Sequence, residues 1–171
     1  PKLAALLTGS GASGVRTMAA FAIGEIESIN GAEAILKALK DGSTAESTRA
    51  RAVEAAGKIA AANAKDPRSK ELGNAIISTL ESEHAKAHKF DHETVLLGLT
   101  ALLRVRPDGA DVTAAKFLTS PDARVRADAG FGFDPQAGWP SHLVRLCERC
   151  ESDRVADRPF ALRSEALDRS G

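Results

Sequence analysis

The sequence predicts an all-α protein, an α-solenoid of stacked antiparallel helix pairs with about three full pairs and partial pairs at each end. The first observation is a repeat: residues 16–26 and 49–59 align at an offset of 33 residues. The second is that no stretch alternates apolar and polar residues as a strand would. Self-similarity at a period of 20–50 residues is typical of stacked arrays, because one amphipathic hairpin cannot bury its apolar face alone.

The aligned segments share an arginine, several small residues, a glycine and an isoleucine. The matched pairs are Arg16 and Arg49, Ala19 and Ala52, Ala22 and Ala55, Gly24 and Gly57, and Ile26 and Ile59. The frame returns at Glu93 and at Val125-Arg126, so its spacings are 33, 44 and 33 residues. A helix-interior glycine costs about 1 kcal/mol relative to alanine. We therefore expect a tight helix contact at Gly24 and Gly57, and burial of Ala19 and Ala52 between neighbouring helices.

Apolar spacing and cap signals predict seven helices before the last repeat begins. They cover residues 2–8, about 13–28, 32–40, from the 43–47 hydroxyls to about 62, 69–87, from Asp91 to 104, and 111–118. Ser43 and Glu46 have capping-box spacing, and Asp91 is a suitable N-cap. Ser120-Pro121 is interpreted as the N-cap and first position of a further helix. The inward face of the helix over 69–87 is expected to hold Leu72, Ala75, Ile76 and Leu80.

Composition narrows the function classes. Lys plus Arg and Asp plus Glu number 23 each, so no net charge favours nucleic acid or a membrane surface as a partner. No apolar run approaches the roughly 20 residues of a membrane span. No signal peptide is visible, so we expect a cytoplasmic location. Because the sequence begins at Pro1 within the repeat pattern, we also expect a fragment or appendage of a larger protein.

The predicted organisation is a repeat domain over residues 1–130 and an irregular tail over 131–171. All nine Lys residues lie at or before Lys116, whereas eight Arg and no Lys follow it. The tail is either a genuine capping segment, since terminal repeats are atypical, or the product of a frameshift. We expect it to be loosely packed or disordered apart from a short helix at about 142–150.

Three motifs suggest chemistry but lack its context. Residues 9–14 match the Gly-x-Gly-x-x-Gly dinucleotide fingerprint, yet the preceding segment is predicted to be a helix and the fingerprint needs a strand there. His84, His88 and His92 lie four residues apart and are weak candidates for a metal site, because a new helix is expected to begin beyond Asp91. Cys147 and Cys150 are one Cys-x-x-Cys, whereas a structural zinc site needs four ligands. No cofactor is expected.

Arg16, Arg49 and Arg126 recur once per repeat near helix starts. They could form a ladder for a ligand, but the preferred interpretation is structural. Each arginine is expected to bind carbonyl groups or an acid of the adjacent repeat.

The repeated Val/Thr-Arg-x-x-Ala-x-x-Ala-x-Gly-x-Ile pattern resembles HEAT repeats, and more closely the short HEAT-like repeats named after phycobilisome bilin lyases. The resemblance covers roughly residues 1–130. The third pair departs from it, with Glu93 at the arginine position and Ala101 at the glycine position. The resemblance implies an α-solenoid whose second helices build a concave binding face. Most such repeats are scaffolds, and in bacteria some are appendages of enzymes such as prolyl isomerases.

The expected function is a non-enzymatic scaffold or protein–protein interaction module, since no nucleophile, base and orienting group can be assembled from the spacings. The alternative is an enzyme accessory of the bilin-lyase type that holds a small molecule in the groove, although the absence of Tyr counts against a pigment. A protein partner is expected on the polar sides of the second helices. The candidate contact residues are Lys37, Lys40, Asn74, Ser78, Glu81 and Lys116.

Overall fold

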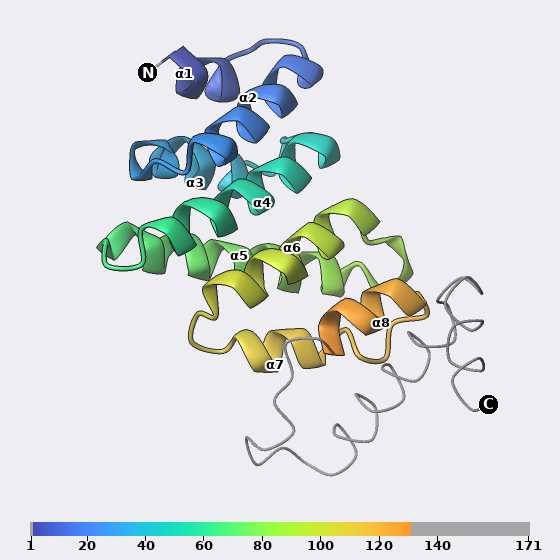
Figure 1. Cartoon of the computed structure of the whole chain (residues 1–171). Helices are drawn as coiled ribbons and strands as arrows, with labels where there is room; N and C mark the ends of the chain where they lie inside the picture. The colour runs from blue at the N-terminus through green and yellow to red at the C-terminus, as the bar shows by residue number, and fades with distance from the viewer. Residues whose placement is uncertain (1, 131–171) are drawn as a thin grey trace, which may run out of the picture.

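The computed structural model describes residues 2–130, and this part of the chain is helical without any strand (Figure 1). The predicted all-α class is therefore confirmed. The α-helices are α1 (Lys2–Thr8), α2 (Ser13–Ile26), α3 (Ala32–Lys40), α4 (Glu46–Ala62), α5 (Pro67–Ala85), α6 (His92–Val105), α7 (Ala110–Ala115) and α8 (Ala123–Gly130). Two 3-10 turns, η1 (Ile29–Gly31) and η2 (Ala87–Lys89), precede α3 and α6.

The helices form two layers. In one layer α2, α4, α6 and α8 follow one another side by side, and in the other α1, α3, α5 and α7 do the same (Figure 1). The pairs α3–α4, α5–α6 and α7–α8 join the layers. Each helix thus packs mainly on its neighbours along the stack, which is how a solenoid buries amphipathic hairpins.

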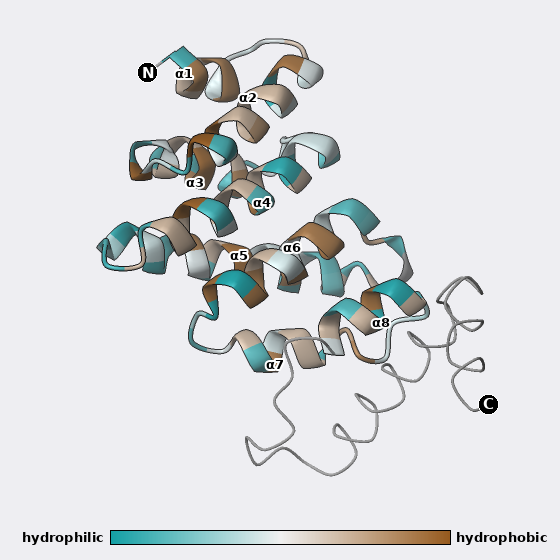
Figure 2. Cartoon of the chain, viewed as in Figure 1, coloured by the Kyte–Doolittle hydropathy of each residue, from teal (hydrophilic) through white to brown (hydrophobic). Residues whose placement is uncertain are grey.

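One continuous apolar core runs through the stack from Leu7 on α1 to Ala129 on α8. Most ribbons in Figure 2 carry both hydrophobic and hydrophilic residues, the amphipathic pattern that such packing requires. Ala19 and Ala52 are 3% and 0% exposed, as predicted. The predicted inward residues of α5 are also all buried.

The recurring glycines mark the closest helix contacts. A Cβ added at Gly24 would lie 2.9 Å from the Cβ of Ala55, and one added at Gly57 would lie 2.5 Å from the Cβ of Ala101. The first contact joins α2 to α4 and the second joins α4 to α6. The predicted tight approach is confirmed at both positions.

One predicted helix start and one predicted cap are wrong. Helix α5 begins at Pro67 rather than Ser69, because the Asp66 side chain accepts a hydrogen bond from the Arg68 amide and caps the helix. The capping box at the start of α4 does not form: the N-cap is Ala45, and the Ser43 hydroxyl donates to Asp41 Oδ1 at 2.6 Å. Because the Ser43 hydroxyl bonds the Asp41 carboxylate, it does not cap α4.

The last repeat also differs from its prediction. Helix α7 ends at Ala115 instead of Leu118, because the amides of residues 116, 117 and 118 each bond the carbonyl three residues back, which tightens the chain into turns. Helix α8 begins at Ala123, and its cap is Asp122, which accepts from the Val125 amide at 2.9 Å. Ser120 instead accepts a hydrogen bond from the Asp122 amide within the preceding turn.

The predictions for 131–171, including the short helix at 142–150 and both cysteines, lie outside the described residues. The division into a repeat domain and a tail therefore stays a prediction. Within residues 2–130, no helix is both long and apolar enough to cross a membrane.

Candidate binding groove

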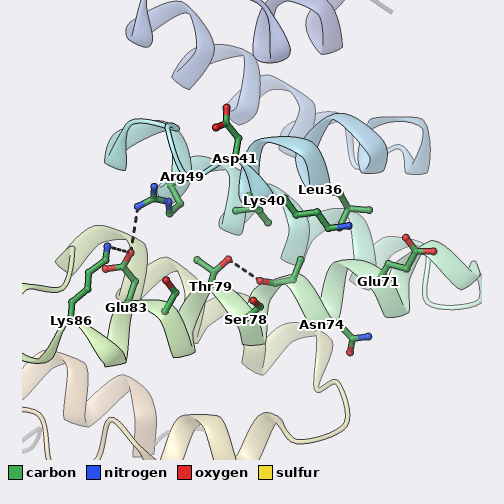
Figure 3. Close-up of a pocket in the computed structure, with 14 residues that line it drawn as sticks. Leu36, Lys40, Asp41, Arg49, Glu71, Asn74, Ser78, Thr79, Glu83 and Lys86 are labelled. Carbon is green, nitrogen blue, oxygen red and sulfur yellow. Dashed lines mark hydrogen bonds and ion pairs between the residues drawn. The ribbon is translucent and has the colours of Figure 1, made fainter.

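A groove of about 830 Å³ lies between α3 and α5, with the start of α4 at one end (Figure 3). Its α5 wall carries residues from Glu71 to Lys86 at helical spacing, so one face of α5 is presented along the groove. Its other wall comes from Leu36 to Gly42 at the end of α3. Both walls belong to the layer formed by α1, α3, α5 and α7.

The middle of the groove combines apolar and neutral polar surface. Leu36 and Leu39 on α3 contribute apolar groups, and exposed Asn74 and Ser78 on α5 contribute hydrogen-bonding groups. Binding sites generally combine an apolar lining with a few well-placed polar groups. This part of the groove can accept aliphatic side chains and bond to peptide groups.

A buried carboxylate, that of Glu83, lies at the end of the groove where α4 begins. Glu83 is 1% exposed, and its Oε1 accepts a hydrogen bond from Lys86 Nζ at 2.6 Å while Arg49 Nη1 lies 3.6 Å away. Its Oε2 accepts the backbone amide of Asp91 at 2.9 Å. A buried charge must be paired and hydrogen-bonded to be tolerated, and Glu83 meets both conditions.

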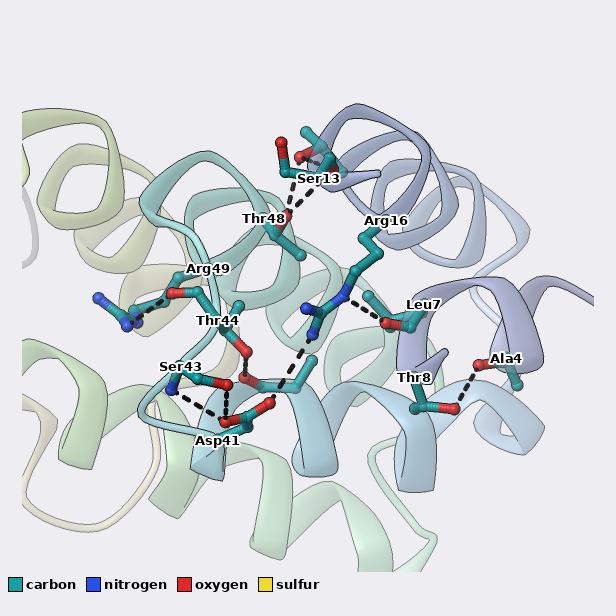
Figure 4. Close-up of polar contacts among 12 residues, drawn as sticks. Ala4, Leu7, Thr8, Ser13, Arg16, Asp41, Ser43, Thr44, Thr48 and Arg49 are labelled. Atoms are coloured by element: carbon teal, nitrogen blue, oxygen red, sulfur yellow. Dashed lines mark hydrogen bonds and ion pairs between the residues drawn. The ribbon is translucent and has the colours of Figure 1, made fainter. Parts of the chain in front are cut away.

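The recurring arginines are structural, as the preferred interpretation expected. Arg16 donates to the Leu7 carbonyl at 2.9 Å and faces Asp41 at 3.8 Å (Figure 4). Arg49 donates to the Thr44 carbonyl at 2.9 Å in the same way. Arg126 donates to the carbonyls of Ser120 and Pro121.

Asp41 lies at the rim of the groove with its charge already stabilised. The Ser43 hydroxyl and the Ser43 amide both donate to Oδ1, and Arg16 lies nearby, so the pKa of Asp41 is lowered from its ordinary value. Asp41 is therefore ionised at neutral pH and committed to the turn that follows α3.

The groove brings together three of the six predicted contact residues, namely Lys40, Asn74 and Ser78. Lys37 is exposed on α3 but does not line the groove. Glu81 and Lys116 pair with each other at 2.6 Å, which ties α5 to the turn after α7. Binding by any of these residues stays a prediction.

Glu83 and Lys86 line the groove although the sequence patterns did not indicate them as contact residues. A signal for Glu83 was present, because it continues the inward stripe of Leu72, Ile76 and Leu80. A carboxylate on such a stripe must find a buried partner. The position of Arg49 was recognised, but its approach to an acid 34 residues later depends on how α4 and α5 pack.

The histidines considered for a metal site, His84, His88 and His92, do not form a common site in the described part of the chain. The His84 ring contacts Phe117 edge-on at 5.4 Å, the His88 side chain lies outside the description, and His92 opens α6 with Nδ1 3.4 Å from Asp122 Oδ2. Within the described residues, no group of three or more His, Cys, Asp or Glu side chains is arranged to hold a metal. The 9–14 segment follows a helix, α1, and leads into α2, so it lacks the strand that a dinucleotide site needs.

Comparison with known proteins shows a likeness of fold to a solved structure. No family model matches the chain, and no curated protein matches its sequence. A crystal structure of an engineered protein is similar to it, with 24% identity and a TM-score of 0.55 over 88% of this chain and 67% of that one. At this identity the likeness concerns the fold alone.

Proposed function

We propose that the chain is a non-enzymatic HEAT-like helical-repeat module that binds a protein partner in the groove between α3 and α5. The observation that carries the proposal is the groove itself, an 830 Å³ depression lined by side chains from three helices. Support for the HEAT-like assignment comes from the register of Gly24 and Gly57, which make the same type of contact one repeat apart.

The dimensions of the groove suit a short peptide segment. Glu71 on α5 and Lys86, the residue directly after α5, are 15 positions apart, which corresponds to roughly 22 Å at 1.5 Å per residue. An extended chain covers that length with about seven residues. Because the walls are packed helices, little ordering of the receptor opposes binding.

Selection of random octapeptides displayed on phage, against the full chain, tests the proposal. Enriched peptides should bind the natural chain and lose binding to Ser78→Arg, which places a long charged side chain in the middle of the groove. The control is Thr100→Arg, at an exposed position of α6 that does not line the groove. Peptides that bind both variants equally well would contradict the proposal.

A small-molecule function is the second candidate, because the groove volume falls within the roughly 300–1,000 Å³ of ligand pockets. A thermal-shift screen distinguishes it. A reproducible rise in Tm with one compound, abolished by Ser78→Arg and kept by Thr100→Arg, would favour this candidate over peptide binding.

A further inference from the structure

We propose that the Arg49–Lys86 end of the groove binds an acidic side chain of the partner peptide. This inference rests on the proposed function and adds the chemistry of one contact. The partner is a peptide segment with Asp or Glu at the position that reaches Arg49 and Lys86.

The first support is the balance of charge at this end. Two cationic side chains, Arg49 and Lys86, share one carboxylate, that of Glu83. Among the side chains that line this end of the groove, the two cations and the single anion leave one positive charge in excess, because the Asp91 carboxylate caps α6 and does not line the groove. Both oxygens of Glu83 are already used, Oε1 by the two cations and Oε2 by the Asp91 amide.

The second support is the depth of the three groups. The Glu83 side chain is 1% exposed, that of Arg49 is 16% exposed and that of Lys86 is 34% exposed, and all three line the groove. The carboxylate therefore lies beneath the cations. A ligand that enters this end meets N–H donors before it meets an acceptor.

The third support is that the cations retain donor capacity. A guanidinium has five N–H donors and an ammonium has three. Arg49 hydrogen-bonds the Thr44 carbonyl, while its contact with Glu83 at 3.6 Å is an ion pair beyond hydrogen-bond length. An incoming carboxylate can accept charge-assisted hydrogen bonds from both side chains.

The other charged side chains that line the groove are Lys40, Asp41 and Glu71. Lys40 extends toward Leu36, away from Arg49 and Lys86 (Figure 3). Asp41 is held by Ser43 and Arg16, so it is engaged away from this cluster. Glu71 lines the groove about 22 Å from Lys86 along α5, so the far end offers an anion instead. One end of the peptide should therefore carry the acid, at a constant position relative to the groove.

The octapeptide selection described above tests the inference when the enriched sequences are aligned. We expect Asp or Glu at one constant position. In a selected synthetic peptide, replacing that residue with Asn or Gln should weaken binding about tenfold, measured by isothermal titration calorimetry. Raising the NaCl concentration should lower the affinity of the acidic peptide and leave the affinity of its amide counterpart almost unchanged.

A protein variant gives the matching measurement. Lys86→Gln should reduce affinity for the acidic peptide and abolish the difference between the acid and its amide. Lys89→Gln, the same change three residues away at an exposed position outside the groove, should preserve both. If Lys86→Gln does not fold, the acid-to-amide change in the peptide, measured on the natural chain, decides alone.

The failures are distinguishable. Peptides that need the groove but show no acid preference would overturn this inference and leave the proposed function standing. Absence of any peptide sensitive to Ser78→Arg would overturn both. Equally tight binding of inorganic phosphate at the same end, without such peptides, would overturn the choice of a peptide as occupant.

Discussion

Gly57→Ala is the sharpest test of the helix stack. The added Cβ would lie 2.5 Å from the Cβ of Ala101 and 2.8 Å from its Cα, closer than the 3.4 Å at which ordinary contact begins. The second neighbour is backbone, so a rotamer change cannot relieve the clash. Helices α4 and α6 must separate by roughly 1 Å, which disturbs a packed core.

Two effects of opposite sign determine how much Gly57→Ala changes the free energy of unfolding. Overpacking a core costs about 1–3 kcal/mol, whereas replacing glycine by alanine in a helix gains up to about 1 kcal/mol. Because the clash at Gly57 involves backbone, we take the upper end of the cost and expect a net destabilisation of about 2 kcal/mol. At Gly24 the nearest distance is 2.9 Å, so Gly24→Ala should lie closer to neutral.

The assay is urea denaturation followed by circular dichroism, with Gly14→Ala as the matched control. An added Cβ at Gly14 on α2 meets no described atom within 4 Å, so that change should be neutral or stabilising by up to about 1 kcal/mol. The expected order of stability is Gly14→Ala, then Gly24→Ala, then Gly57→Ala. If Gly57→Ala were as stable as Gly14→Ala, the close approach of α4 and α6 would be refuted.

Glu83→Ala should lower the free energy of unfolding by about 2–3 kcal/mol in the same assay, because two cations and the Asp91 amide lose a buried acceptor. A loss below about 0.5 kcal/mol would show that the carboxylate is not buried. Asp91→Ala should cost about 1 kcal/mol, because its side chain accepts the Thr94 amide at 2.8 Å as the N-cap of α6, and restoration by Asn would confirm the capping role. Partial burial raises the pKa of Glu54, but hydrogen bonds from Lys58 and Arg51 outweigh this effect and leave the pKa below its ordinary 4.5. The ion pairs of Glu54 therefore stabilise the fold above pH 4.5. This contribution to the free energy of unfolding is lost as the pH falls through the lower pKa of the folded state. Glu54→Gln should therefore flatten the acid limb of a plot of Tm against pH. We expect an effect of less than about 1 kcal/mol, because Glu54, Lys58 and Arg51 are only partly buried and solvent screens their ion pairs. An unchanged acid limb would contradict the ion pairs.

Helix positions could be predicted because local signals agreed with the packing. The predicted limits of α1 and α3 match the structure, and Asp91 caps α6 through its own side chain. The glycine contacts could be predicted because a costly residue recurred at one repeat position. In each case the information lies within a few residues or one period of the chain.

The groove could be predicted only in part, because it depends on pairs of helices. The polar side of α5 indicated Asn74 and Ser78, but the sequence does not state how far α3 lies from α5. Lys116 was assigned to an exposed helix face, whereas the early end of α7 places it in a turn within reach of Glu81. Residue spacing alone also does not predict when a neighbouring side chain takes up a capping group, as Asp41 does with the Ser43 hydroxyl.

The recurring arginines Arg16 and Arg49 contact the ends of neighbouring helices in the layer that forms the groove. Arg16 joins the carbonyl of Leu7 at the end of α1 to Asp41 after the end of α3. Arg49 repeats this one step later, between the Thr44 carbonyl after α3 and Glu83 near the end of α5.

Each of these two arginines therefore links the ends of consecutive second helices, and the Arg49 contacts join the two walls of the groove. At the third pair Glu93 replaces the arginine and bonds Arg51 instead, at 3.0 Å. There the link between second helices is the Glu81–Lys116 ion pair, which is more exposed than the Arg49–Glu83 pair. The buried Arg49–Glu83 link thus lies at the groove, so the arginine that joins α3 to α5 also supplies one of the positive charges of the groove.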